Sequence, residues 1–276
     1  MKEFLIRSIS GLLFATVLMG AIVLGPWSFA LLFGLFSIFI LREFYQLSKV
    51  AGVSPQRITG MVIGGSVFFT VFLSLKGVIS INMNGLYLST LFVVPALELF
   101  RSKNNSLENM AVTLFGIFYV TFSFALFNYL VFPDFPHGNQ YDPTLLIFLF
   151  LMIWAYDSGA YLFGITLGKH RLFERISPKK SWEGFFGGWF VTLIMAYALQ
   201  HFFPAYRLLF LGLMATTVTI TGTLGDLIES MIKRNLGLKD SGKFMPGHGG
   251  LLDRIDSVTA AAPLYALGLF GSGVIE

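Results

Sequence analysis

The sequence contains no cysteine and very little charge. Only 12% of its 276 residues are Asp, Glu, Lys or Arg, whereas soluble domains carry about 25%. The absence of cysteine excludes disulfides, thiolate metal sites and cysteine nucleophiles, and it leaves the redox compartment open. The chain therefore has about half of the charge that a water-facing surface needs.

Hydrophobic side chains make up 55% of the chain, and 31 of them are Phe. Apolar runs near or above 18 residues, which is the criterion for a transmembrane helix, recur along the whole sequence. The nine predicted spans are residues 8–24, 27–41, 58–75, 78–99, 110–132, 144–167, 184–203, 208–232 and 257–274. The expected fold class is an all-α, polytopic integral membrane bundle with about nine transmembrane helices.

Basic residues predict the orientation of these spans. Counted from the N-terminus, the odd-numbered segments outside the spans hold 17 of the 19 Lys and Arg residues, and the even-numbered segments hold 2. Positive charge is retained in the cytoplasm, so the N-terminus is predicted to be cytoplasmic and the C-terminus to lie outside. The loops 168–183 and 233–256, with five basic residues each, are both predicted to be cytoplasmic.

Two regions are expected in the chain. Residues 1–140 contain the first five hydrophobic spans, and residues 141–276 contain spans six to nine with the two basic loops. The stretch Ser230–Asp256 combines five basic residues with three aspartates, a histidine and a glycine-rich turn. Such a polar segment between hydrophobic runs predicts that the chemistry lies in the C-terminal region.

Acidic side chains inside or beside the hydrophobic spans form the first candidate site. They are Asp157, Asp226, Glu229, Asp253 and Asp256. A charge at the centre of a membrane helix costs about 2.5–3.5 kcal/mol on insertion scales, so these groups need a polar cavity, a cation or a basic partner. The spacing allows the last four to converge on a divalent cation, or to form ion pairs with Arg234 and Arg254. Ion pairing suits Asp226 least, because no base lies within one helical turn of it.

Magnesium is the cation that these residue types favour. With no cysteine and no pair of histidines at ligand spacing, zinc is a poor fit, whereas carboxylates beside phosphate-binding bases suit Mg²⁺. The bases expected to hold phosphate oxygens are Lys233, Arg234, Lys239, Lys243 and Arg254. Gly247, Gly249 and Gly250 free the backbone to approach a ligand closely. Together these features predict a site for a nucleoside triphosphate and a second phosphate.

A second anion-binding segment is expected at Ser177–Gly184. Its two lysines, in a proline-ordered turn before a glycine-initiated helix, can bind an anionic substrate, although an interfacial anchor of the positive-inside type would look the same. Gly164–Lys169 is rejected as a phosphate loop, because its spacing is one residue short and no Ser or Thr follows the lysine. His248, between glycines, is expected to position substrate by a hydrogen bond rather than to act as a base.

Three blocks of sequence resemble the CDP-diacylglycerol synthases (phosphatidate cytidylyltransferases). The longest runs from Ser230-x-x-Lys233-Arg234 through Lys239-Asp240-x-Gly242 and Pro246-Gly247-His248-Gly249-Gly250 to Leu252-Asp253-Arg254-Ile255-Asp256. The other two are Asp157-Ser158-x-Ala160-Tyr161 and Ser177-Pro178-Lys179-Lys180-Ser181-x-Glu183-Gly184. Ser181 stands where threonine is more usual, and this change keeps the hydroxyl. The resemblance covers about the last 130 residues, and the earlier part is similar only as a hydrophobic bundle.

The resemblance implies that CTP and phosphatidate give CDP-diacylglycerol and pyrophosphate with Mg²⁺, and that a second, monovalent cation such as K⁺ shares the site. It implies the metal ligands Asp226, Asp253 and Asp256, with Asp157 and Glu229 as further candidates for binding or orienting the ion. The catalytic set adds Lys233, Arg234 and Arg254 to the three aspartates. The expected substrate-binding residues are Lys179, Lys180, Ser181, Lys239, Asp240, His248, Gly249 and Gly250.

The expected partners are CTP, a phosphatidate lipid, the bilayer and a second copy of the chain in a helical homodimer, with no nucleic acid. The location expected is the cell membrane, with the active site near its cytoplasmic face. A transporter or ion channel is the main competing interpretation, because intramembrane acids also mark ion pathways. Two further possibilities are a CDP-alcohol phosphotransferase, whose DG…AR…G…D…D pattern is not found, and a non-catalytic lipid-binding bundle.

Overall fold

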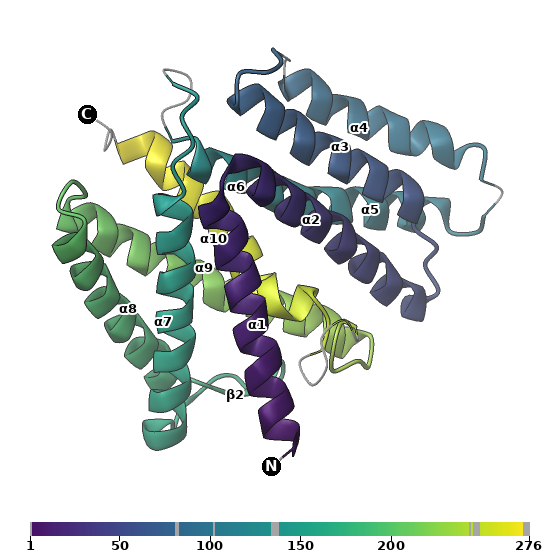
Figure 1. The fold of residues 1–276 in the computed structure, drawn as a ribbon. Helices are drawn as coiled ribbons and strands as arrows, with labels where there is room; N and C mark the ends of the chain where they lie inside the picture. Colours follow the sequence, from purple (N-terminus) through teal and green to yellow (C-terminus); the bar gives the residue numbers. More distant parts are fainter. Residues whose placement is uncertain are drawn as a thin grey trace. The chain divides into compact units, whose positions relative to one another are not determined.

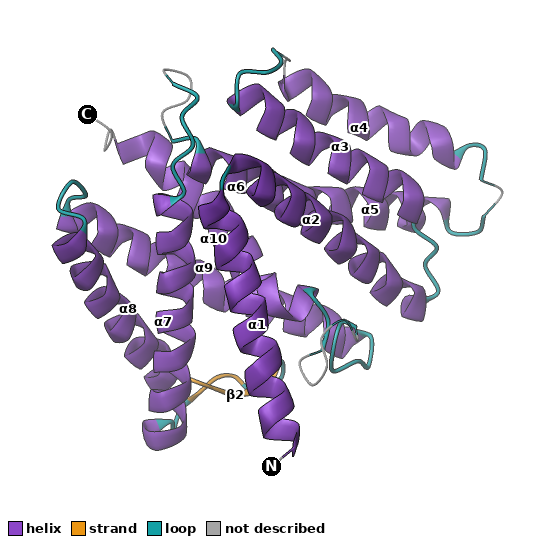
Figure 2. Ribbon diagram, in the orientation of Figure 1, coloured by secondary structure: helices purple, strands orange, loops and turns teal. Residues whose placement is uncertain are grey.

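The structure, a computed structural model, describes residues 2–80, 83–101, 103–133, 138–242, 244 and 249–272. The chain forms two compact units. The first consists of Met1–Pro143 with Asn235–Arg254, and the second consists of Thr144–Arg234 with Ile255–Glu276. The described part is predominantly α-helical, and Figure 2 shows one short pair of strands.

Six α-helices form the first unit (Figure 1): α1 (Lys2–Leu24), α2 (Pro26–Ser48), α3 (Arg57–Leu75), α4 (Met83–Glu98), α5 (Ser106–Gly116) and α6 (Ser123–Val131). A 3₁₀ turn, η1 (Lys49–Ala51), follows α2, and a π-helical segment, η2 (Ile117–Phe122), joins α5 to α6. The break between α1 and α2 follows from sequence. Gly25 adopts a φ of 136°, and Pro26 is the first residue of α2, where its missing N–H has no intrahelical partner to lose.

Phenylalanine side chains form the core of the first unit. The fully buried rings come from three helices: Phe29, Phe33, Phe68, Phe72, Phe124 and Phe127. The rings of Phe33 and Phe127 meet edge to face, with their centroids 5.4 Å apart, a geometry that aromatic quadrupoles favour. A Cβ atom at Gly60 would overlap the ring of Tyr45, so this glycine allows close helix packing.

The second unit contains α7 (Thr144–Leu167), β1 (Arg171–Phe173), β2 (Ser177–Ser181), α8 (Trp182–Phe202), α9 (Leu208–Asn235) and the part of α10 (Leu252–Ser272) from Ile255 onward. Strands β1 and β2 pair antiparallel, with Arg171 opposite Ser181. The predicted proline-ordered turn before a glycine-initiated helix is therefore wrong. Pro178 lies in a strand, and the helix begins at Trp182. A two-stranded sheet has only edge strands, and an edge position tolerates a proline without an N–H group.

Glycines allow α7 and α8 to pack closely. A Cβ atom at Gly188 would lie 2.7 Å from two ring carbons of Tyr156 and 2.9 Å from its carbonyl oxygen. At Gly184 it would lie 2.9 Å from the carbonyl oxygen of Ala160. Small residues at the contact thus allow the backbones of this helix pair to approach closely.

Six helical segments among the described residues are long and apolar enough to cross a membrane: Pro26–Ala51, Arg57–Leu75, Ser106–Val131, Thr144–Leu167, Trp182–Phe202 and Leu208–Asn235. Two shorter apolar helical segments are Ile9–Leu24 and Leu88–Glu98. Helix α8 also exposes an apolar stripe at helical spacing, formed by Phe186, Phe190, Ile194 and Tyr197. Such a surface suits contact with lipid, so the expected all-α membrane bundle is confirmed as a class.

Several helices extend further into polar sequence than predicted. Helix α2 continues to Ser48 instead of ending near residue 41, α9 continues to Asn235, and α10 begins at Leu252. The segment between α9 and α10, residues 236–251, is called the polar loop below and is shorter than the predicted loop 233–256. Lys233 pairs with Glu229 one turn earlier in α9, an i,i+4 contact that stabilises the last turns of the helix.

Candidate functional site

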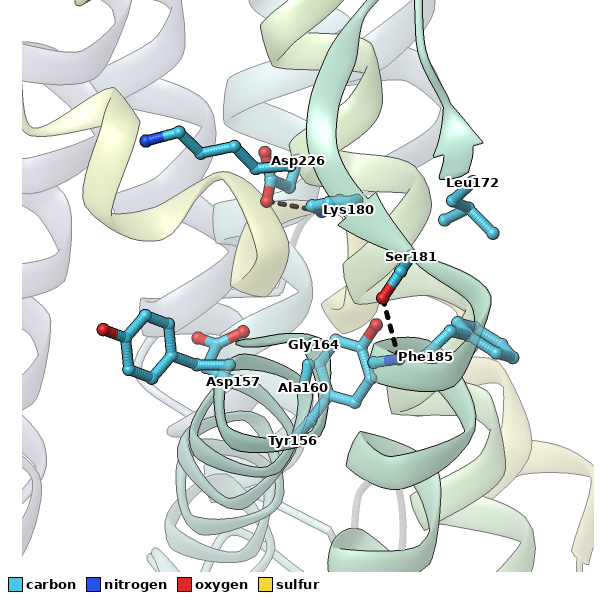
Figure 3. A pocket seen from close by; sticks show the side chains of 12 residues that line it. Tyr156, Asp157, Ala160, Gly164, Leu172, Lys180, Ser181, Phe185 and Asp226 are labelled. Atoms are coloured by element: carbon cyan, nitrogen blue, oxygen red, sulfur yellow. Dashed lines mark hydrogen bonds and ion pairs between the residues drawn. The ribbon is translucent and has the colours of Figure 1, made fainter. Parts of the chain in front are cut away.

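A cavity of about 290 Å³ lies in the second unit (Figure 3). Its walls come from α7, the β1–β2 hairpin, the first turn of α8 and the middle of α9. The lining residues are Tyr156, Asp157, Ala160, Tyr161, Gly164, Leu172, Lys179, Lys180, Ser181, Gly184, Phe185 and Asp226. The cavity thus brings together two of the three sequence blocks singled out above, together with Asp226 from a third helix.

Lys180 and Asp226 form an ion pair at this cavity. The Nζ atom of Lys180 lies 2.5 Å from Oδ2 of Asp226, and Figure 3 shows the two side chains meeting from β2 and α9. Ser230 donates a hydrogen bond of 3.2 Å to the other carboxylate oxygen, Oδ1. Sequence spacing predicted no basic partner for Asp226, because Lys180 is distant along the chain and lies in the hairpin.

Ser181 connects the hairpin to helix α8. Its Oγ accepts a hydrogen bond of 3.1 Å from the N–H of Gly184, so it is the N-cap of α8, a role worth about 1 kcal/mol. Only 3% of Ser181 is exposed. Lys179 and Lys180 precede it on β2 and line the same cavity. The cap therefore fixes where the strand ends and where its two lysines stand, which gives Ser181 a structural role beside its predicted contact with substrate.

Carboxylates gather around this cavity. Asp157 and Asp226 line it, and the buried Asp256 of α10 interacts electrostatically with both of them and with Lys233. Glu229 is almost fully buried and pairs with Lys233. Like charges held close together are unfavourable without compensation. Among the described residues, these four carboxylates are accompanied by three lysines, Lys179, Lys180 and Lys233, a balance that suits a divalent cation with oxygen ligands.

The described residues do not form a preassembled metal-binding site. Within those ranges no group of three or more His, Asp or Glu side chains has the arrangement needed to hold an ion. The predicted ligands belong to both units, since Asp226 and Asp256 lie in the second and Asp253 lies in the first. The three-aspartate metal site therefore stays a prediction.

Asp253 organises the polar loop in the first unit. Its Oδ2 accepts hydrogen bonds from the N–H groups of Gly250 at 2.8 Å and Ser241 at 2.9 Å, and Oδ1 lies 3.1 Å from the Ser241 nitrogen. Gly249 adopts a φ of 84°, in the left-handed region that favours glycine. A carboxylate has about four lone-pair sites, so Asp253 keeps the capacity to bind a cation as well.

The remaining predicted residues are spread over the loop and its flanks. Arg234, Lys239, Asp240 and Arg254 are exposed, and Lys233 is buried in its pair with Glu229. His248, together with Lys243, Pro246 and Gly247, lies outside the described residues. Among the described residues, Lys239 is thus an accessible base of the polar loop itself, and Arg234 and Arg254 are accessible bases on the helices that flank it.

Several contacts were not predicted from the sequence. Tyr156 lines the cavity and its hydroxyl lies 2.5 Å from the hydroxyl of Thr223. Phe185 and Leu172 also line the cavity. In the first unit, Glu43 accepts a hydrogen bond from the N–H of Leu252. The only available signal was local: Tyr156 directly precedes Asp157, and Glu43 is an acid two residues after the end of an apolar run.

Comparison with known proteins covers nearly the whole chain. The model of the cytidylyltransferase family matches residues 5–270. A Haemophilus influenzae protein named phosphatidate cytidylyltransferase is 33% identical over 275 residues, covering 92% of this chain and 94% of its own length. Relatives of the same name from Staphylococcus epidermidis and Staphylococcus aureus are 37% and 38% identical, covering 70% and 66% of this chain and 68% and 67% of their own.

The similarity therefore extends beyond the last 130 residues, into the helices that carried no recognisable motif. The blocks that carried the resemblance contribute Asp157, Lys179 and Lys180 to one cavity, beside Asp226. With the match of residues 5–270, these observations establish that the chain belongs to the cytidylyltransferase family.

Proposed function

We propose that this chain is a membrane nucleotidyltransferase that converts CTP and phosphatidate to CDP-diacylglycerol and pyrophosphate. The observation that carries the proposal is the cavity of the second unit, where Lys179 and Lys180 stand beside Asp157 and Asp226. Lysines recognise phosphate groups as point charges, and carboxylates recognise the cations that accompany nucleotide phosphates. The names of the relatives agree with this chemistry.

The reaction is a displacement at phosphorus. An oxygen of the phosphatidate phosphate attacks the α-phosphorus of CTP, a new P–O–P linkage forms, and pyrophosphate leaves with the electron pair of the broken bond. The second pKa of a phosphomonoester is about 6, so the nucleophile is largely a dianion near neutral pH. A protein base is therefore not required, and His248 need not accept a proton.

Electrostatic repulsion is the obstacle that the protein must overcome. Two anionic substrates have to approach, and further negative charge develops on the leaving pyrophosphate. Lys179 and Lys180 at the cavity, with Lys233, Arg234, Lys239 and Arg254 at the polar loop and its flanks, are proposed to bind the phosphoryl oxygens. Fixed positive groups lower the barrier because they need no reorganisation during the reaction.

Asp226, Asp253 and Asp256 are proposed to hold Mg²⁺, with Asp157 and Glu229 as further ligands or as residues that orient the ligands. The chemistry of the donor set supports this assignment, since carboxylate oxygens are the ligands that Mg²⁺ prefers. When bound, the ion would neutralise phosphate charge and help to orient CTP. A second, monovalent cation such as K⁺ belongs to the same proposal.

The proposed topology has nine membrane crossings and a cytoplasmic N-terminus. Contacts in the first unit support it. Arg101 donates a hydrogen bond of 2.9 Å to the carbonyl oxygen of Ser54, and both segments are predicted to be cytoplasmic. The Tyr141 hydroxyl donates a 2.6 Å hydrogen bond to the carbonyl oxygen of Ile22, which joins two segments predicted to lie at the opposite face.

Contacts in the second unit also lie in two groups, one at each end of α7. The Lys180–Asp226 pair joins the hairpin of loop 168–183 to the half of α9 that continues toward the polar loop. At the other end of α7, the ring of Phe148 packs against Phe203 and Tyr206 with centroid separations of 5.1 and 5.2 Å. These contacts support a cytoplasmic position for the cavity, where CTP enters from water and phosphatidate enters from the bilayer.

A transporter or channel function has no support from the relatives, which are named as cytidylyltransferases. A homodimer is kept in the proposal because the resemblance of the motifs implies it. Light scattering on the purified protein in detergent would show twice the mass of one chain, and a single-chain mass would remove the dimer.

Purified full-length protein, supplied with CTP and phosphatidate, is expected to release pyrophosphate and form CDP-diacylglycerol in equal amounts. Release of CMP instead would identify a phosphotransferase of the CDP-alcohol type. Asp226→Asn preserves the shape of the side chain and removes its charge, so it is expected to abolish product formation. Glu174→Gln changes an exposed acid in the β1–β2 turn and serves as the matched control.

A further inference from the structure

Glu43 is a buried carboxylate that the proposed reaction does not use. It lies near the C-terminal end of α2, directly before the buried Phe44 and Tyr45, and only 8% of the residue is exposed. An ionised group in such a position is costly unless polar partners compensate it. Glu43 has such a partner, because its Oε2 accepts a hydrogen bond of 2.9 Å from the N–H of Leu252, 209 residues further along the chain.

Leu252 is the first residue of helix α10. The first N–H groups of a helix have no intrahelical acceptor, and a negative charge at this end is favourable. Glu43 therefore supplies from α2 the acceptor that a local N-cap side chain would otherwise supply. The contact joins the N-terminal bundle to the point where the polar loop becomes α10.

Two glycines of the polar loop pack against the same carboxylate. A Cβ atom at Gly242 would lie 2.8 Å from Oε1 of Glu43, and one at Gly250 would lie 2.7 Å from Oε2. Neither glycine has a positive φ, so backbone conformation does not require glycine at these positions. Close approach to Glu43 requires glycine at Gly242, and at Gly250 a Cβ atom would meet both Glu43 and, closer still, the Oγ of Ser241. Packing thus explains both glycines without reference to a bound ligand.

Asp253 lies next to this contact. It accepts the N–H of Gly250 at 2.8 Å and that of Ser241 at 2.9 Å. Gly250 is thus hydrogen-bonded to Asp253 and packed against Glu43. A displacement of Glu43 would move the backbone that fixes the Asp253 carboxylate.

We propose that Glu43 is a positioning residue for cytidylyl transfer. It holds the polar loop at Gly242 and Gly250 and the start of α10 at Leu252, so that Asp253 and Lys239 meet the CTP phosphates in one geometry. The inference rests on the proposed function for its catalytic consequence. It assigns a role in the reaction to α2, in the half of the chain whose sequence suggested only a hydrophobic bundle.

Glu43→Ala and Glu43→Gln in the purified full-length protein separate this role from a merely structural one. A small misplacement of catalytic groups can cost about 10²-fold, so Glu43→Ala is expected to lower kcat by about tenfold or more and to raise the Mg²⁺ concentration needed for half-maximal rate. Glu43→Gln keeps an oxygen acceptor for Leu252 and is expected to retain most of the activity. Equal loss in both variants, or wild-type kinetics in Glu43→Ala, would overturn the proposal.

Gly242→Ala provides a second, independent test. The added methyl group would displace Glu43, so the single variant is expected to reproduce the kinetics of Glu43→Ala. In the double variant Glu43→Ala/Gly242→Ala the obstructing carboxylate is gone, and the second substitution is expected to add little. Losses that multiply in the double variant would show that the two residues act separately.

Amide hydrogen exchange gives a readout that does not depend on activity. The N–H groups of Ser241, Gly250 and Leu252 are expected to exchange at least about tenfold faster in Glu43→Ala than in wild type, while α7 is unchanged. Unchanged exchange at these three groups would overturn the positioning role. If the wild-type protein formed no CDP-diacylglycerol, the proposed function would fail, and the exchange data would still decide whether Glu43 holds the loop.

Discussion

The ammonium group of Lys180 lies 2.5 Å from the carboxylate of Asp226 and joins strand β2 to helix α9 beside the cavity. A lysine without a carboxylate partner has a flexible side chain, so it would bind phosphate without a defined position. A lysine paired with a carboxylate has a defined position and can exchange that partner for an incoming phosphate, while the carboxylate becomes available to a cation. This pair is therefore the element on which we expect substrate and metal binding to depend.

Lys180→Met is expected to lower kcat/KM by about 10²–10³, the loss typical of removing one preorganised charge-stabilising group. Lys180→Arg keeps the charge but replaces a compact ammonium by a planar guanidinium, so partial activity is expected. The assay is CDP-diacylglycerol formation from CTP and phosphatidate. Lys49→Met removes an exposed lysine just after α2 and is the control. Wild-type kinetics in Lys180→Met would remove this residue from the mechanism.

Removal of divalent cations by EDTA is expected to stop cytidylyl transfer, and added MgCl₂ is expected to restore it. The physical reason is the excess of carboxylates around the cavity, which would repel CTP without a compensating cation. The measurement is pyrophosphate release against free Mg²⁺ concentration. Asp256→Asn should shift that curve to higher Mg²⁺. A full rate in EDTA would contradict the metal assignment.

Gly188→Ala is expected to destabilise the second unit by about 1–3 kcal/mol, the usual cost of overpacking. The added methyl would lie 2.7 Å from the Tyr156 ring, and Tyr156 lines the cavity, so activity should fall as well. Gly212→Ala in α9 is the matched control, because no atom lies within 4 Å of its added Cβ. The measurement is the thermal unfolding of both variants in detergent. Equal unfolding temperatures would show that the added methyl group between α7 and α8 does not lower stability.

The absence of native cysteine allows the proposed topology to be tested directly. Single cysteines at the exposed positions Asn104 and Glu174 are expected to be protected from a membrane-impermeant maleimide in intact cells. Cysteines at Gln140 and Ala205, also exposed, are expected to react. Labelling at Glu174 from outside would place the hairpin on the wrong face and would contradict the cytoplasmic site.

Local patterns predicted the helices well because each hydrophobic run has to satisfy its own backbone hydrogen bonds. The predicted ranges 58–75 and 144–167 agree closely with α3, Arg57–Leu75, and α7, Thr144–Leu167. Helix ends were predicted less well where polar side chains continue the helix, as at Ser48 and Asn235. There, pairs such as Glu229–Lys233 stabilise the helix without hydrophobicity.

The candidate residues were also accessible to sequence reasoning, because an acid or a pair of lysines in an apolar chain is conspicuous. Asp157, Lys179, Lys180 and Asp226 do line one cavity. Their partners could not be predicted. Asp226 pairs with a lysine 46 residues away in sequence, and nothing in the helix that carries Asp226 indicates this.

Composition, hydrophobic periodicity and charged side chains by themselves determined that this protein is an α-helical membrane protein, and they predicted that its chemistry lies in the C-terminal half. Those properties depend on side-chain type and short spacing, which a sequence displays directly. Tertiary structure alone decided that Lys180 meets Asp226, and that Glu43 of α2 holds the start of α10. Such contacts depend on how distant segments pack, and no local energy term encodes that packing.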